Sequence, residues 1–439
     1  MSKEHHRLQE SREGKPWKKW GPYLSERQWA TVREDYSKHG NAWESVTHDQ
    51  SRSKAYRWGE DGLGGISDDD QRICFNWAFW NGKDPIIKER LFGLTGIEGN
   101  HGEDVKELYY YLDSTPTHSY MKMLYKYPQN RFPYEQLVDT NRAIGKDKTE
   151  YELIDTGVFD KDEYFDIFLE YAKCSEEDIC FQATIHNRGK NDAEIHALPT
   201  LWMRNTWSSG EDKILPEIKA TGDLTAEVNH HTLGNYHLYI NDDFDELVFC
   251  NNETNRKQLY GIPNSKKYVK DGVNNYLIHK ADTIDPDRKG TKCAGILKAT
   301  VPASGKVVVK VRLSKEQINS PFYEFDQHLL ERKADCDSFY RNTQHKVLDP
   351  DLRNIQRQAY AGMMWNKQYY YYNIREWLNG DKGRIAPPEE RKKGRNNDWQ
   401  HLQNADVISM PDKWEYPWYA AWDLAFHCIP IARIDPDFA

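Results

Sequence analysis

The sequence predicts an α+β chain in which an antiparallel β-sandwich precedes a helical region. Between about residues 150 and 315 side chains alternate between apolar and polar, whereas after residue 320 apolar side chains recur every three or four positions. A chain of 439 residues is also long enough for two or three domains with separate cores. The change of period therefore marks the expected domain boundary.

Four regions are expected in order. Residues 1–25 are polar and are expected to be poorly ordered. Residues 26–320 are expected to form the β-sandwich region, within which residues 57–113 are rich in Gly, Asp and aromatic residues. Residues 321–350 are predicted as a linker helix, and residues 351–439 as the start of a helical domain.

The clearest strand covers residues 181–186, where Phe181, Ala183 and Ile185 alternate with polar side chains. A turn at 187–189 precedes a second alternating run, and residues 307–313 repeat the pattern. One apolar face and one polar face are typical of antiparallel strands with one side in water. These strands therefore predict a sandwich.

Two helical stripes follow the strands. The first consists of Phe325, Leu329, Cys336 and Tyr340. The second follows the Asp349-Pro350 break and consists of Leu352, Ile355, Ala359, Met363 and Asn366. Residues 380–397 combine Pro, Gly and the charge run Arg391, Lys392, Lys393 and Arg395, and are predicted to form a solvated loop.

The composition excludes several classes of protein. The formal net charge of −9 argues against a nucleic-acid binder, and no apolar run reaches the roughly 18 residues of a membrane span. The charged N-terminus has no secretory h-region, and the seven cysteines form no CxxC pair. We therefore expect a cytoplasmic protein that contacts no membrane and needs no obligate protein partner.

Several motifs of catalysis and cofactor binding are missing from the sequence. It contains no GxxxxGK[ST], HExxH or GxSxG. His230-His231 is an isolated pair, which we interpret as surface histidines, so no metal is expected.

Aromatic residues are unusually frequent, at 13 % of the chain, and near the C-terminus they surround carboxylates. Flat rings with a polar group suit sugars, although filling of large cores would explain them equally well. Aromatic packing raises the pKa of a carboxyl, as a general acid requires. Asp423, between Trp422 and the apolar residues 424–426, is the best candidate; the alternative is an Asp in the first turn of a helix, where it meets the macrodipole.

The segment WDLAFH at residues 422–427 resembles the W-D-x-x-F-H segment of glycoside hydrolase family 63, which includes processing α-glucosidase I and enzymes related to mannosylglycerate hydrolases. Longer segments resemble an uncharacterised microbial and fungal branch of that family. They are YRWGEDGLGGISDDDQ, WNGKDPIIKERLFGLTGIEGNHGEDVKELYYYLDSTPTHSYMK, LPTLWMRNTW and MPDKWEYPWYAAWDLAFH. The resemblance covers nearly the whole chain.

The resemblance implies a β-sandwich superdomain followed by an (α/α)6 catalytic barrel, and inverting hydrolysis of α-glucosidic bonds in oligosaccharides or small glucosides without a cofactor. It assigns Asp423 as general acid and a distant Glu as base. Residues 351–439 have room for three or four helices rather than twelve, so the chain resembles an N-terminal portion, with the base beyond Ala439. The expected carbohydrate contacts are Trp414, Glu415, Trp418, Tyr419, Trp422 and His427.

Other interpretations remain open at this level. Glu415, eight residues before Asp423, could replace the missing base, although packing or sugar contact fits it better. The chain could also be a carbohydrate-binding or structural β-sandwich without catalysis, or an inactive short homologue.

Overall fold

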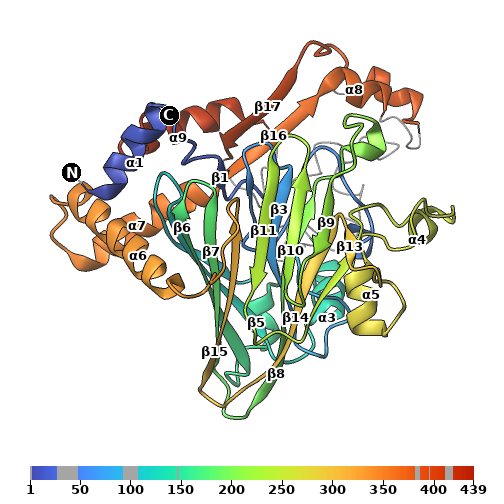
Figure 1. Cartoon of the computed structure of the whole chain (residues 1–439), viewed down its shortest axis with the longest axis horizontal. Helices are drawn as coiled ribbons and strands as arrows, with labels where there is room; N and C mark the ends of the chain where they lie inside the picture. The colour runs from blue at the N-terminus through green and yellow to red at the C-terminus, as the bar shows by residue number, and fades with distance from the viewer. Residues whose placement is uncertain are drawn as a thin grey trace.

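The computed structural model describes residues 2–26, 48–91, 107–145, 148–380, 386–394, 396–410 and 419–439 (Figure 1). Two antiparallel sheets dominate this part of the chain. The larger has nine strands in the order β13-β9-β10-β11-β15-β7-β6-β5-β4, and the smaller has six in the order β1-β2-β3-β8-β14-β12.

The strands of the larger sheet are β4 (Tyr109–Ser114), β5 (Tyr120–Pro128), β6 (Tyr164–Ser175), β7 (Asp178–Asn187), β9 (Glu217–Ala220), β10 (Thr225–His230), β11 (Gly234–Ile240), β13 (Lys289–Gly290) and β15 (Lys306–Ser314). Those of the smaller sheet are β1 (Trp20–Gly21), β2 (Ile66–Asp68), β3 (Ile73–Trp80), β8 (Ala193–Met203), β12 (Glu246–Cys250) and β14 (Lys292–Val301).

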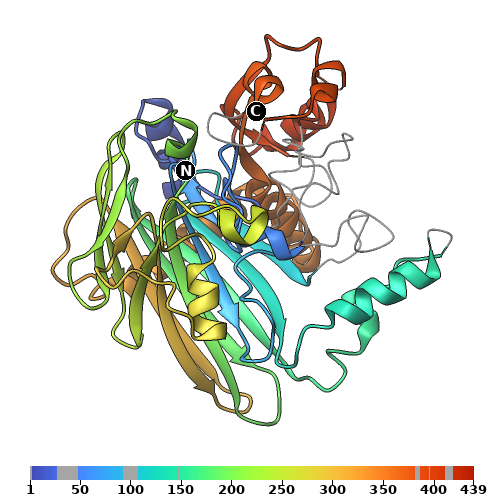
Figure 2. The ribbon, with the colours of Figure 1, turned by 90° about the vertical axis from the view of Figure 1, so that its right-hand side faces the viewer.

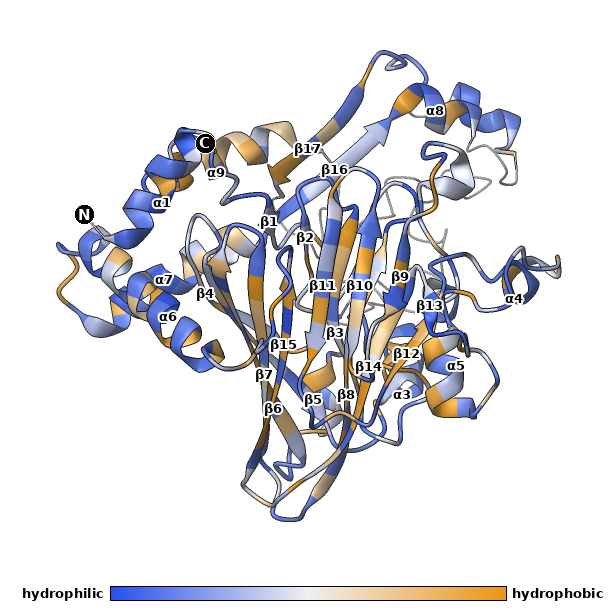
Figure 3. Cartoon of the chain, viewed as in Figure 1, coloured by the Kyte–Doolittle hydropathy of each residue, from blue (hydrophilic) through white to orange (hydrophobic). Residues whose placement is uncertain are grey.

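The main core lies between the two sheets, which pack face to face (Figure 2). Phe75 of β3 stacks on Phe181 of β7 with ring centroids 4.0 Å apart. Hydrophobic and hydrophilic residues alternate along β10, β11 and β15 of the larger sheet, as the predicted period of two requires (Figure 3). The register pairs Phe181 with Val311 and Ala183 with Val309, so the predicted apolar residues share the core face. The antiparallel sandwich is confirmed.

Helix α6 (Phe325–Thr343) confirms the first helical stripe, because Phe325, Leu329, Cys336 and Tyr340 are all buried. It packs mainly on β6. Strand β15 ends at Ser314 and α6 begins at Phe325, so the change of period near residue 320 is a change from strand to helix, while the division into domains stays a prediction.

Helix α7 (Pro350–Trp365) is also where the sequence predicts it, with Asp349 accepting the N–H of Asp351 as N-cap. The predicted core face is wrong, however. Leu352 and Ile355 are 54 % and 56 % exposed, whereas the buried residues are Tyr360, Ala361, Met364 and Trp365.

The reason is the large side chain at the end of α7. The ring of Trp365 stacks on Tyr111 of β4 at 5.2 Å, and its Nε1–H donates to the carbonyl oxygen of Asp113 at 3.1 Å. Burying this indole against the sheet turns the aliphatic stripe of α7 toward solvent.

The N-terminal segment was expected to be poorly ordered, and this expectation is wrong. Residues Lys3–Arg12 form helix α1, which Ser2 caps and which packs on α6. Glu4 is fully buried and accepts hydrogen bonds from Thr117 and Ser119, while Arg7 pairs with Asp335 at 2.5 Å. Partners more than 100 residues away compensate the polarity of this segment, so its composition does not predict its order.

Near the C-terminus, an antiparallel ribbon of β16 (Lys367–Asn373) and β17 (Gln403–Ser409) lies between α7 and α9 (Ala421–Ile431), where helices and a loop but no strands are expected from the sequence. Its four consecutive tyrosines, 369–372, favour a strand and are all buried.

Smaller helices complete the described elements: α2 (His48–Ser51), α3 (Tyr134–Ile144), α4 (Arg256–Tyr260), α5 (Gly272–His279) and α8 (Ile374–Asn379). None of the helices in the described ranges combines the length and apolarity that a bilayer span needs.

The predicted loop at 380–397 is only partly solvated within its described residues. Lys392 is exposed and pairs with Glu389 at 2.9 Å. Arg391, in contrast, is buried, because its guanidinium lies 4.7 Å from the ring centroid of Trp377 and donates to the Trp377 carbonyl oxygen at 3.2 Å.

Candidate functional site

The candidate acid Asp423 lies in the first turn of α9. This is the position that the simpler alternative predicts, in which a carboxylate meets the positive end of the helix dipole. Trp422 and Phe426 form an edge-to-face pair at 5.6 Å, but they are 71 % and 60 % exposed. The expected enclosure of Asp423 by its neighbours in sequence is therefore not found, because both rings project from α9 toward solvent.

His427 lies one turn after Asp423 on the same face of α9. Its Nδ1 is hydrogen-bonded to Ser409 Oγ at 2.8 Å, which ties α9 to the end of β17. Burial lowers the pKa of His427, and the charge of Asp423 opposes this shift. The site therefore places a carboxylate one turn from a predominantly neutral imidazole at neutral pH.

Of the expected substrate-binding residues, Tyr419, Trp422 and His427 are described. Tyr419 approaches Tyr370 of β16, with ring centroids 5.9 Å apart. Trp414, Glu415 and Trp418 lie outside the described residues, so their part of the candidate site stays a prediction.

The structure gives a role to two of the quoted sequence segments. Arg57, from YRWGEDGLGG, is buried and binds Glu211 at 3.1 Å and Glu376 of α8, with its guanidinium 4.7 Å from the Trp58 ring centroid. Since Glu211 follows β8 and Glu376 follows β16, this cation connects the sandwich to the C-terminal ribbon.

Arg204, from LPTLWMRNTW, acts at the same junction. It donates to the carbonyl oxygens of Gln71 and Asp70, both at 3.2 Å. Its guanidinium lies 5.5 Å from the ring centroid of Tyr369 and 5.4 Å from that of Tyr371. These buried hydrogen bonds and cation–π contacts explain why the two segments contain arginines. Arg57 and Arg204 hold β16 in position against the sandwich.

One group of possible metal ligands is present in the described ranges. The ligand atoms of Asp212, His230 and His231 lie within 4.8 Å of one another. His230 is buried, so its interpretation as a surface residue is wrong. The N–H of Thr232 donates to His230 Nδ1 at 3.2 Å, and His231 Nε2 lies 3.2 Å from Asp212 Oδ1. These two contacts occupy atoms that would otherwise be available to bind a metal ion. They favour a structural role for the three residues over metal binding.

Acidification is expected to destabilise the protein through His230. Burial lowers the pKa of this histidine from 6.5 to about 4, and the charges of His231 and Arg72 act in the same direction. Because His230 binds a proton more readily in the unfolded chain than in the folded one, acid favours unfolding. The contribution of neutral His230 to the free energy of unfolding is fully present above pH 6.5 and is lost as the pH falls toward 4. Because the neighbouring Asp212 and His231 are not buried, solvent screens part of the charge on His230, and we expect a loss of about 1–2 kcal/mol. Urea unfolding at pH 7 and pH 4.5 should show a smaller loss for His230→Gln than for the wild type; equal losses would contradict this assignment.

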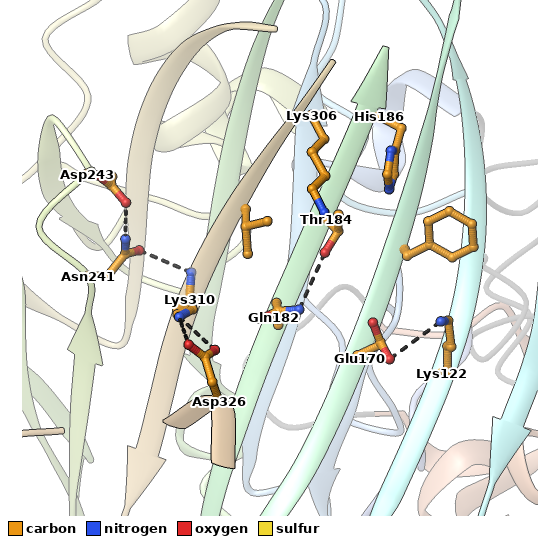
Figure 4. Close-up of a pocket in the computed structure, with 12 residues that line it drawn as sticks. Lys122, Glu170, Gln182, Thr184, His186, Asn241, Asp243, Lys306, Lys310 and Asp326 are labelled. Carbon is orange, nitrogen blue, oxygen red and sulfur yellow. Dashed lines mark hydrogen bonds and ion pairs between the residues drawn. The ribbon is translucent and has the colours of Figure 1, made fainter. Parts of the chain in front are cut away.

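A second candidate site is a basin of about 630 Å³ on the outer face of the larger sheet (Figure 4). Four neighbouring strands, the loop after β11 and the start of α6 contribute its lining. The lining residues are Lys122, Phe168, Glu170, Gln182, Thr184, His186, Asn241, Asp243, Lys306, Val308, Lys310 and Asp326. The alternation over residues 181–186 and 307–313 already puts the polar side chains of β7 and β15 on one face of each strand. The register that brings these two strands together with β5 and β6 leaves no local signal in the sequence.

Comparison with family models finds no match. The chain is 44 % identical over 485 residues to Uncharacterized protein YMR196W of Saccharomyces cerevisiae, in a match that covers 99 % of this chain and 45 % of the yeast protein. The chain thus spans less than half the length of this relative. Among solved structures, a putative kojibiose phosphorylase from the human microbiome matches with a TM-score of 0.25 and 7 % identity, over 74 % of this chain and 36 % of that chain. This likeness is too low to assign a fold.

Proposed function

We propose that this chain forms the N-terminal part of a glycoside hydrolase-like enzyme, related to family 63, that hydrolyses α-glucosidic bonds with inversion. The observation that carries the proposal is the WDLAFH segment on α9, which puts the partly exposed Asp423 beside the exposed ring of Trp422 at the start of one helix. Protonation of a glycosidic oxygen requires a carboxylic acid that the substrate can reach, and an adjacent aromatic ring suits the apolar face of a sugar.

In the proposed reaction Asp423 donates its proton to the leaving oxygen, while a second carboxylate removes a proton from the attacking water on the opposite face of the sugar. The two carboxyl groups of inverting enzymes are roughly 6.5–9.5 Å apart. We assign the second carboxylate to a Glu in a region that corresponds to the rest of the yeast relative. The substrate would be an oligosaccharide or small glucoside, and no cofactor takes part.

Exposed apolar surfaces support a larger helical domain around this site. Trp422, Phe426 and Ile429 recur on one face of α9 and are at least 60 % exposed. Leu352 and Ile355 on α7, which shares an apolar cluster with the end of α9, are also exposed. Further helices packed on these faces, as in an (α/α)6 barrel, would bury them.

The test uses a chain extended by the region that corresponds to the remainder of the yeast relative. We expect it to hydrolyse a glucose disaccharide with an α-1,2, α-1,3 or α-1,4 bond, and proton NMR should detect β-glucose as the first anomer released. The 439-residue chain should show no measurable turnover, because the proposed base is absent. Initial release of α-glucose would exclude inversion, and turnover by the 439-residue chain would place the base within it. Inactivity of the longer chain on all three disaccharides would favour a non-catalytic carbohydrate-binding or structural protein.

A further inference from the structure

The basin of Figure 4 is built from regular cross-strand rows of side chains. The strand register aligns Lys122, Glu170, Gln182 and Lys310 in one row across β5, β6, β7 and β15. The next row in the same direction contains Leu124, Phe168, Thr184 and Val308, and the third contains Lys126, Asp166, His186 and Lys306. Side chains two residues apart share a face of the sheet, so all three rows point outward together.

The middle row is predominantly apolar and the two outer rows are polar. Phe168 is half-buried at its centre, between the ammonium group of Lys122, 5.1 Å from the ring centroid, and the His186 ring at 5.7 Å. Successive rows are about 6.6 Å apart along the strands, and four strands span about 14 Å. Within the basin the middle row consists of Phe168, Thr184 and Val308. The basin therefore offers two apolar side chains on its floor, with hydrogen-bonding groups along both sides.

The charges that line the basin are balanced, since three lysines face three carboxylates. Lys122 lies 3.5 Å from Glu170, and Lys310 pairs with Asp326 of α6 at 2.8 Å. Burial lowers the pKa of His186, so its ring adds little charge at neutral pH. A polyanion would need an excess of cations and a cationic ligand an excess of carboxylates; the balance favours a neutral ligand.

We propose that this basin binds a neutral oligosaccharide lying across β5, β6, β7 and β15. Sugar rings have apolar C–H faces and hydroxyl edges, which match the apolar middle row and the polar rows beside it. Asn241 and Asp326 close the β15 end, where Asn241 Oδ1 accepts the N–H of Lys310 at 3.1 Å. No residue of α9 lines the basin, so the proposal does not depend on Asp423.

The experiment measures binding of maltotriose, isomaltotriose and cellotriose to the 439-residue chain by saturation-transfer NMR and calorimetry. At least one trisaccharide should bind saturably, with an affinity that changes little between 50 and 500 mM NaCl. Phe168→Ala should weaken that binding about tenfold or more. Gln182→Ala, which changes a half-buried outward side chain and spares the core, should also weaken it.

Lys219→Ala is the matched control, because Lys219 is exposed on β9 of the same sheet and lies outside the basin. Its binding should equal that of the wild type. Failure of all three sugars to bind, or wild-type affinity in both basin variants, would overturn the proposal. Salt-sensitive binding of heparin in place of the trisaccharides would do the same. Loss of binding in Asp423→Asn with full binding in Phe168→Ala would move the ligand to α9, leaving the proposed function intact and the basin proposal wrong.

Discussion

Replacing Asp423 by Asn is expected to lower turnover of a plain glucose disaccharide by two orders of magnitude or more in the extended, active chain. The amide keeps the size of the carboxyl group but cannot donate the acidic proton that the leaving oxygen needs. General acid catalysis typically contributes 10²- to 10⁴-fold, which sets the expected range. Initial rates with the disaccharide measure the effect.

Leaving-group dependence separates loss of the acid from misfolding. Glucosyl fluoride and nitrophenyl glucosides need little protonation, so Asp423→Asn should retain much more of its activity on them. Asp351→Asn is a suitable control, because Asp351 also occupies the first turn of a helix, in this case α7. A shared effect of both substitutions on thermal stability would reflect the helix dipole, worth about 0.3–1 kcal/mol. Near-normal disaccharide turnover by Asp423→Asn would remove the general-acid assignment.

Replacing Glu4 by Ala is expected to lower the free energy of unfolding by about 3 kcal/mol, in the range for removal of one partner from a buried charged network. The Glu4 carboxylate accepts from the Thr117 N–H at 2.9 Å, and from the hydroxyls of Thr117 and Ser119, both at 2.7 Å. Alanine leaves these donors buried without their acceptor and leaves Arg7 with Asp335 alone. Urea denaturation followed by far-UV circular dichroism measures the change.

Glu13→Ala provides the comparison, because Glu13 belongs to the same segment and its contact with Gln9 is exposed. We expect its effect to stay within about 0.5 kcal/mol. If Glu4→Ala were as mild, helix α1 would contribute little to the stability of the sandwich, and the segment would behave as its composition suggests.

The candidate site was predictable only in part. The position of Asp423 at a helix start follows from the local sequence, and α9 begins two residues before it. The surroundings of Asp423 do not follow, because Trp422 and Phe426 share a helical face that the described structure leaves in solvent. The rows of side chains in the basin could not be predicted either. They depend on the register between strands that begin as far apart in the chain as residues 120 and 306, which is a long-range property.

The sequence by itself determined the elements whose signal is local. Alternation over residues 181–186 and 307–313 fixed the core face of β7 and β15, and the stripe from Phe325 to Tyr340 fixed α6, because chain geometry repeats every two or about 3.6 residues. Only the tertiary structure decided which face of α7 is buried and that the polar segment 1–25 contains an ordered helix. The indole of Trp365 and the carboxylate of Glu4 bind partners more than 100 residues away in the chain. The spacing of apolar residues within a short segment cannot predict such long-range contacts.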